Sequence, residues 1–260
     1  MPDIDDTAVG TPFKGFDNKH VLFSGTTGSG KTALFTLMIN KNLFEIPDQI
    51  YWIDSGHTQE QFKNFHKSVL AVRALKDGST KDLSSIRVHF VPKENVTLLI
   101  NSELKNQDKK LVVFEDTTSY DSKVQKDVFN YISVAKNTNA QVVLFKHMSS
   151  KDKVYYQYFG YYVLCRPNYR DYNSIINGRS NLNTPVFSIE KVLVKLPEKY
   201  RSIIYVQETQ KEYFAYGRLG EITEAHEINR DERNQSASSA LDNKQSANAA
   251  NLLSSLLTSK

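Results

Sequence analysis

The chain has 260 residues, of which 40% are hydrophobic, so it can form one large domain or two small ones with a core of ordinary size. Its formal net charge of +4 is too small to separate proteins that bind an anionic polymer from those that do not. The one cysteine, Cys165, excludes an intrachain disulfide framework and favours a reducing compartment.

The sequence shows no targeting signal. Its first ten residues are acidic and lack the apolar centre of a signal peptide. No apolar run approaches the length needed to span a bilayer. We therefore expect a soluble, intracellular protein that does not contact membranes.

Hydrophobic patterning divides the chain into alternating strands and helices. Residues 1–18 are polar and are predicted to be a flexible leader. Strands are predicted at residues 19–24, 49–54, 86–92, 141–145 and 161–165 and within 109–119, and helices at 30–42, 58–69, 94–104 and 122–137. This alternation is typical of parallel βαβ units and predicts an α/β fold, a three-layer sandwich around a mainly parallel central sheet.

The C-terminal part has a different pattern. Two strands within residues 201–217 surround a turn at 208–211 and predict an antiparallel hairpin at the edge of the sheet. Residues 221–260 are polar and poor in aromatic side chains, so we expect a largely disordered tail after a domain spanning 19–220. Within that tail a short amphipathic helix is predicted at 247–258 from the helical spacing of Ala249, Leu252, Leu253, Leu256 and Leu257.

A glycine-rich turn joins the first predicted strand to the first predicted helix. It fits the pattern G-x-x-x-x-G-K-[ST] and consists of Gly25, Thr26, Thr27, Gly28, Ser29, Gly30, Lys31 and Thr32. In such a loop the glycines let backbone N–H groups converge on a phosphate, and the helix N-terminus faces the same charge. Lys31 would neutralise phosphate oxygens, and the Thr32 hydroxyl would ligate Mg²⁺. The sequence therefore predicts a P-loop NTPase fold that binds ATP with Mg²⁺.

Two acids follow the most apolar predicted strand, in "LVVFED". Glu115 is expected to hold Mg²⁺, and Asp116 to orient and polarise the attacking water. The order of the two acids leaves the division of these roles open. The next strand ends in Lys146 and His147, which would arrive beside the γ-phosphate and sense its presence, although a solvated lysine and a partly buried histidine are an equal alternative.

The order of these motifs resembles the poxvirus-type genome-packaging ATPases of the FtsK–HerA superfamily, which occur in Polinton-like elements, virophages and larger DNA viruses. The resemblance covers residues 19–220. It rests on "VLFSGTTGSGKT", "KKLVVFEDTTS", "NTNAQVVLFKHMSS", "YYVLCRPNYRDYNSIING" and "SIIYVQETQKEYFAYGRL". The resemblance implies a homo-oligomeric ring that hydrolyses ATP and drives double-stranded DNA into a capsid, in the host cytoplasm or a viral factory or associated with the virion.

The resemblance also assigns roles to residues. Lys31 and Thr32 match the phosphate loop of the family, and Glu115 and Asp116 match its paired acids, the first of which is more often Asp. Lys146 falls where the family has a polar sensor, typically Gln. Arg170 falls near an arginine that reaches the neighbouring subunit's γ-phosphate, with Arg166 and Arg179 as rivals. The terminal helix could dock on a capsid protein.

Two other functions remain open at this point. A small-molecule or nucleotide kinase would also use a phosphate loop, but it needs a lid and an acceptor pocket, and the sequence shows no lid signature. A nucleotide-dependent assembly switch would bind ATP without turnover, which the second acid disfavours. Contact with DNA phosphates is predicted for a group of basic residues that could equally form a solvated face, namely Lys105, Lys109, Lys110, Lys123 and Lys126.

Overall fold

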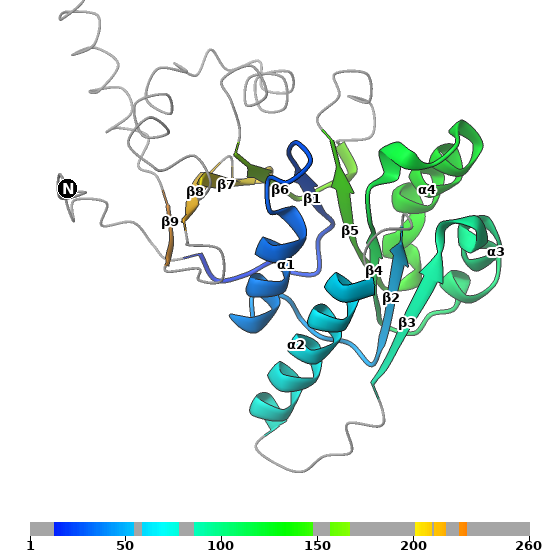
Figure 1. Ribbon diagram of the computed structural model, residues 1–260, viewed down its shortest axis with the longest axis horizontal. Coiled ribbons are helices and arrows are strands. Elements are labelled where there is room, and N and C mark those ends of the chain that lie inside the picture. The colour runs from blue at the N-terminus through cyan, green and yellow to red at the C-terminus, as the bar shows by residue number, and fades with distance from the viewer. Residues whose placement is uncertain are drawn as a thin grey trace, which may run out of the picture.

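The computed structural model describes residues 13–54, 59–77, 86–147, 157–166, 201–209, 211–216 and 224–227. In these segments the strands form one sheet in the order β3-β2-β4-β5-β1-β6-β7-β8-β9 (Figure 1). The strands from β3 to β6 in this order are parallel, and those from β7 to β9 continue the sheet antiparallel. The predicted α/β fold with a mainly parallel sheet is therefore confirmed.

The elements have the following bounds. The strands are β1 (Val21–Ser24), β2 (Gln49–Asp54), β3 (Arg87–Pro92), β4 (Lys110–Phe114), β5 (Ala140–Lys146), β6 (Tyr161–Cys165), β7 (Arg201–Val206), β8 (Lys211–Tyr216) and β9 (Glu224–Glu227). The helices are α1 (Lys31–Asn40), α2 (Gln59–Asp77), α3 (Val96–Asn101) and α4 (Ser122–Val134). Short 3₁₀ turns lie at Lys93–Asn95, Glu103–Lys105, Thr117–Ser119 and Ala135–Thr138.

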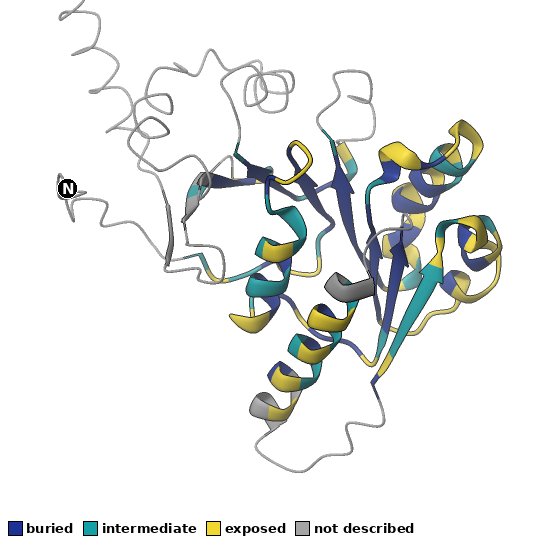
Figure 2. Cartoon of the chain, viewed as in Figure 1, coloured by how far each residue is buried: buried dark blue, intermediate teal, exposed yellow. Residues whose placement is uncertain are grey.

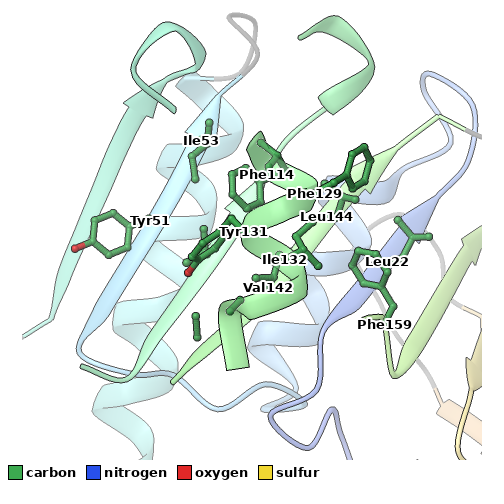
Figure 3. Close-up of a cluster of buried hydrophobic side chains, with 14 of the residues drawn as sticks. Leu22, Tyr51, Ile53, Phe114, Phe129, Tyr131, Ile132, Val142, Leu144 and Phe159 are labelled. Carbon is green, nitrogen blue, oxygen red and sulfur yellow. The ribbon is translucent and has the colours of Figure 1, made fainter. Parts of the chain in front are cut away.

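Two hydrophobic layers hold the helices on opposite faces of the sheet. Because successive side chains of a strand point to opposite faces, Leu22 and Phe23 of β1 belong to different layers. Phe23 packs in the layer under α1 and α2, with Phe35 among its contacts. Leu22 belongs to the layer under α3 and α4, where Figure 3 shows the side chains of α4 lying over the strands. Figure 2 shows the central strands buried and the outer helix faces exposed, as in a three-layer sandwich.

Strand β1 lies in the middle of the sheet between β5 and β6. Val21 is in register with Val143 on one side and with Tyr161 on the other, and both pairings are parallel. The carboxyl ends of β1, β4, β5 and β6 therefore meet at one edge of the sheet. In open α/β sheets this edge is where ligands bind, particularly beside a strand whose two neighbours are reached from opposite directions.

The N-terminal segment packs against the domain, which the sequence analysis did not anticipate. Phe16, within the predicted leader, is 3% exposed and stacks on Phe44 with ring centroids 4.4 Å apart. Its ring also meets Tyr161 of β6 edge-on at 5.1 Å. Two large apolar side chains, Phe13 and Phe16, in a polar stretch produce no strand or helix periodicity, and this explains the omission.

The antiparallel end of the sheet contains the predicted hairpin. Strands β7 and β8 pair with Val206 opposite Lys211, so the connection starts one residue before the predicted turn at 208–211, and Lys211 already belongs to β8. The hairpin is not at the edge, however, because β9 pairs with β8 beyond it. Strand β9 lies at residues 224–227, within the segment that was assigned to a polar tail. The helix predicted at 247–258 lies outside the described residues.

None of the helices in the described segments combines the length and the apolar character that crossing a membrane requires.

Candidate nucleotide-binding site

The predicted phosphate loop connects β1 to α1 at the carboxyl edge of the sheet. Gly28 and Gly30 have φ values of 73° and 87°, in the left-handed region that a side chain makes costly. Gly30 is the residue that precedes α1, and no side chain caps this helix end. The free N–H groups and the positive end of the helix dipole are therefore available to an anion.

Gly25 is required by a close approach to β6. A Cβ atom at this position would lie 2.6 Å from the Cys165 carbonyl oxygen and 2.6 Å from Ser29 Oγ. Neither the backbone of β6 nor the adjacent loop can yield that much space. The start of the phosphate loop is thus fitted against the carboxyl end of β6.

Lys31 folds back over the loop that precedes it. Its Nζ donates hydrogen bonds to the carbonyl oxygens of Gly25 at 2.9 Å and Thr26 at 3.0 Å. Burial lowers the pKa of Lys31 from its ordinary value, while Cys165, Asp116 and Glu115 oppose this shift. The amine is therefore partly desolvated and close to both acids, so an anionic ligand would strengthen its charged form.

Glu115 is brought to the phosphate loop as the sequence predicts. It is 5% exposed, follows β4, and accepts a hydrogen bond at Oε1 from Thr32 Oγ1 at 3.2 Å. Its second oxygen, Oε2, accepts one from Trp52 Nε1 at 3.3 Å. The sequence reasoning gave Trp52 no part in the site, because an indole N–H at the end of β2 becomes meaningful only once β2 is known to neighbour β4.

The donor set at this point suits Mg²⁺. Magnesium prefers hard oxygen ligands and takes few of them from the protein. The Thr32 hydroxyl in the first turn of α1 and the Glu115 carboxylate just after β4 supply two such oxygens. The residues present therefore fit the predicted ion.

Asp116 lies beside Glu115 in a strained backbone position. Its φ of 42° and ψ of 59° place a non-glycine residue in the left-handed region, which is uncommon outside functional sites and turns. Thr118 Oγ1 donates to Asp116 Oδ1, and Ser119 Oγ donates to its carbonyl oxygen at 2.9 Å. The carboxylate is about one-third exposed, so it can reach solvent.

His147 joins the phosphate loop to the second acid. Its Nε2 lies 3.3 Å from Thr27 Oγ1 and 3.4 Å from Asp116 Oδ1. The side chain follows β5, which neighbours both β1 and β4, and this explains why one ring reaches both groups. The sequence places His147 beside Lys146 at this strand end, and the structure brings the ring of His147 to the loop.

The structure brings the backbone of Lys146 to the phosphate loop, where the Gly25 N–H donates to its carbonyl oxygen at 3.3 Å, but its side chain lies elsewhere. Residue 146 is the last of β5, and the alternation of the strand turns its side chain to the face covered by α4. Its Nζ lies 5.0 Å from the centroid of the Phe129 ring, and the side chain is 4% exposed. The Lys146 side chain thus lies on the face opposite the phosphate loop, and its sensor role stays a prediction.

Of the three candidate arginines, Arg166 alone falls within the described residues. It follows β6, has a φ of 49°, and its Nε is buried without a hydrogen-bond partner. Arg170 and Arg179 lie outside the described residues, so the arginine assignment stays a prediction.

Two of the basic residues considered for DNA contact are already engaged. Lys110 is 1% exposed and its Nζ donates to the carbonyl oxygens of Asn106 at 2.6 Å and Thr138 at 2.9 Å. Lys109 forms an ion pair with Glu45 at 2.5 Å. Burial of Lys110 contradicts its expected contact with DNA.

The fold and the loop together define the class of the protein: it has the P-loop NTPase fold. No family model matches the chain, and the comparison with curated proteins gave no match. Among solved structures, the chain is similar to the genome packaging NTPase B204 from Sulfolobus turreted icosahedral virus 2 in complex with sulfate. The TM-score is 0.53 at 13% identity, over 76% of this chain and 96% of that chain.

A second structure of B204, in complex with ATP-gammaS, gives a TM-score of 0.50 at 13% identity over 78% of this chain and 100% of that chain. The EssC ATPases 2 and 3 from Geobacillus thermodenitrificans give 0.46 at 9% identity over 81% of this chain and 39% of that chain. At such identities the similarity to B204 concerns the fold alone. It agrees with the P-loop NTPase fold that the motifs predict.

Proposed function

We propose that the protein is an ATP-hydrolysing motor that forms a homo-oligomeric ring and moves double-stranded DNA into a viral capsid. The observation that carries the ATPase part is the contact between Thr32 of the phosphate loop and Glu115 of β4. The DNA-packaging part is supported by the order of motifs and by the shared fold with a viral genome packaging NTPase.

In the proposed hydrolysis of ATP, each residue of the site has its own role. Lys31 leaves the carbonyl oxygens of its loop for the β- and γ-phosphate oxygens, whose charge it neutralises. Thr32 and Glu115 would hold Mg²⁺, which would supply further charge neutralisation on the phosphates. Asp116 orients the attacking water and accepts its proton as the new P–O bond forms and the bond to the ADP oxygen breaks. The products are ADP and inorganic phosphate.

His147 takes the sensing role that the sequence assigned to Lys146. In the structure it contacts both Thr27 and Asp116, so any ligand that moves the loop changes its position relative to the acid. A polar group that joins the phosphate loop to the catalytic acid can relay the occupancy of the loop to the rest of the subunit.

Hydrolysis fits the site better than transfer to a small acceptor. Asp116 is exposed enough to meet water, and Thr118 and His147 orient its carboxylate. The energy of hydrolysis would then be available for movement of a polymer. In this scheme subunits of the ring contribute an arginine, Arg170 or one of its rivals, to the neighbouring site.

An ATPase assay with and without long double-stranded DNA tests the proposal. We expect DNA to raise the turnover of the wild-type protein, Lys31→Ala to abolish nucleotide binding, and Asp116→Asn to bind nucleotide but lose at least a hundredfold in kcat. Asp108→Asn is a matched control, because this exposed residue precedes β4 at the opposite edge of the sheet. Turnover that requires a small acceptor and ignores DNA would indicate a kinase. Tight ATP binding without turnover would indicate an assembly switch.

A further inference from the structure

Trp52 is the only tryptophan of the chain, and it lies entirely inside the protein. It belongs to β2, which pairs in parallel with β4 so that the Glu115 N–H donates to the Ile53 carbonyl oxygen at 3.0 Å. The side chain of residue 52 thereby comes to lie beside the side chain of Glu115. Two strands that are distant in the sequence thus create this contact.

The Glu115 carboxylate is held at both oxygens by different partners. The Trp52 indole N–H donates to Oε2 at 3.3 Å, and the Thr32 hydroxyl donates to Oε1 at 3.2 Å. A buried carboxylate requires such donors, and a buried indole N–H requires an acceptor. The hydrogen bond between Trp52 and Glu115 therefore gives the buried indole N–H an acceptor and the buried carboxylate a donor, and it fixes the plane of the carboxylate.

The ring of Trp52 is itself rigidly packed. Its centroid lies 4.8 Å from that of Phe65 and 6.3 Å from that of Phe35 on the helices above the sheet. Phe145 of β5 lies at 6.3 Å on the sheet. An indole locked in this aromatic cluster presents its N–H in one direction, as a preorganised donor should.

We propose that Trp52 is the positioning residue that makes Glu115 a competent magnesium ligand; this inference rests on the proposed ATPase function. A glutamate has one more rotatable bond than an aspartate, so its carboxylate is harder to hold in one place. The indole N–H removes that freedom by anchoring Oε2 and leaves Oε1 directed at Thr32. The longer acid at this position is thus matched by a donor on the neighbouring strand.

Magnesium dependence of nucleotide binding distinguishes positioning from a purely structural role. Trp52→Phe keeps most of the ring and removes the N–H. We expect the affinity of this variant for a fluorescent ATP analogue, measured in EDTA, to stay within twofold of wild type, because the phosphate loop is unchanged. The Mg²⁺ concentration for half-maximal tightening should rise roughly tenfold, as the loss of a hydrogen bond to a charged group predicts.

Phe44→Leu is the matched control, because it loosens the same hydrophobic layer through Phe16 and Phe35 and leaves the rings that pack on Trp52 in place. It should leave the Mg²⁺ midpoint unchanged. Glu115→Gln alone should raise the Mg²⁺ midpoint. Adding Trp52→Phe to Glu115→Gln should change the midpoint less than twofold further, because the two residues act as a unit. A wild-type midpoint in Trp52→Phe, with nucleotide binding intact, would overturn the inference.

The wild-type protein provides a second test that needs no substitution. Since Trp52 is the only indole, its emission should change when MgCl₂ is added to the complex with ATP-gammaS and stay unchanged when ATP-gammaS is added in EDTA. Trp52 fluorescence that does not change on addition of MgCl₂ would contradict the positioning role. Failure of the wild-type protein to bind any nucleotide would instead reject the proposed function, so the two failures are distinguishable.

Discussion

His147 Nε2 lies 3.4 Å from Asp116 Oδ1, and the same nitrogen lies 3.3 Å from the Thr27 hydroxyl. One imidazole thus joins the phosphate loop to the acid that we propose activates water. Both contacts come from a residue just past β5, the strand that lies between β1 and β4. This arrangement makes His147 the best candidate for a group that couples loop occupancy to the chemical step.

We expect His147→Ala to lower kcat by about tenfold or more, the typical scale for a residue that orients a catalytic group. The KM for ATP should change less than threefold, because the phosphate loop and Lys31 remain. His147→Gln, which keeps a polar side chain of similar reach, should recover much of the rate. Steady-state kinetics measures both quantities. A normal kcat in His147→Ala together with a large loss in Lys146→Ala would restore Lys146 as the sensor.

Gly25 provides a test of how tightly the loop is fitted to β6. In Gly25→Ala the new methyl group would meet the Cys165 carbonyl oxygen at 2.6 Å, so the loop or the strand must move. We expect a loss of about 1–3 kcal/mol in the free energy of unfolding and a weaker affinity for ATP.

Leu98→Ala is the control for this substitution. Leu98 is 70% exposed on α3, so truncating its side chain leaves the phosphate loop and the core unchanged. Urea unfolding and calorimetric titration with ATP measure the two effects. Equal stability and equal affinity in the two variants would contradict the fit described for Gly25.

His20 predicts a pH dependence of stability. Burial, with a smaller contribution from Lys136, lowers the pKa of His20 from 6.5 to about 4, and its Nδ1 accepts the Val142 N–H at 3.2 Å. Between these two pKa values the unfolded chain binds the proton and the folded chain does not. The stabilising contribution is therefore complete above pH 6.5 and decreases as the pH falls towards 4, by up to about 3 kcal/mol.

Urea unfolding at several pH values between 7.5 and 4.5 measures this slope. His20→Asn retains an acceptor near the position of Nδ1 and cannot titrate, so its free energy of unfolding should change less across the same range. If both proteins lose stability equally on acidification, His20 is not the group responsible.

The trans arginine is open to a mixing experiment. We expect inactive subunits that carry Arg170→Ala to lower the activity of mixed rings more than in proportion, because each would impair a wild-type neighbour. Arg166→Ala and Arg179→Ala are examined in parallel. If the activity of mixed rings falls linearly with the fraction of Arg170→Ala subunits and more steeply with Arg166→Ala or Arg179→Ala, that other arginine is the one that acts in trans.

Local signals in the sequence account for much of the site. The glycines and Lys31 form a continuous motif between a strand and a helix, so their placement follows from neighbouring residues. Glu115 and Asp116 follow an apolar strand, and the carboxyl ends of parallel strands meet at one edge. These residues are close together in the structure as predicted.

The remaining features depend on alternation and on contacts between distant segments. Lys146 and His147 are adjacent, and the side that each faces is set by the pleat of β5, so a shift of one residue decides which reaches the loop. Trp52 gains its role only because β2 neighbours β4. Phe16 is buried through contacts with residues that follow it by many positions, which no local pattern reveals.

The central place of β1 has a consequence for biosynthesis. Its partners β5 and β6 are made only when the chain has grown to residue 165, so the strand that carries the phosphate loop emerges first and waits with both edges open. Such long-range pairing is slow, and unpaired edges invite aggregation. The affinity for ATP that we propose would therefore be acquired late in folding, and it would mark a newly made chain that has completed its sheet.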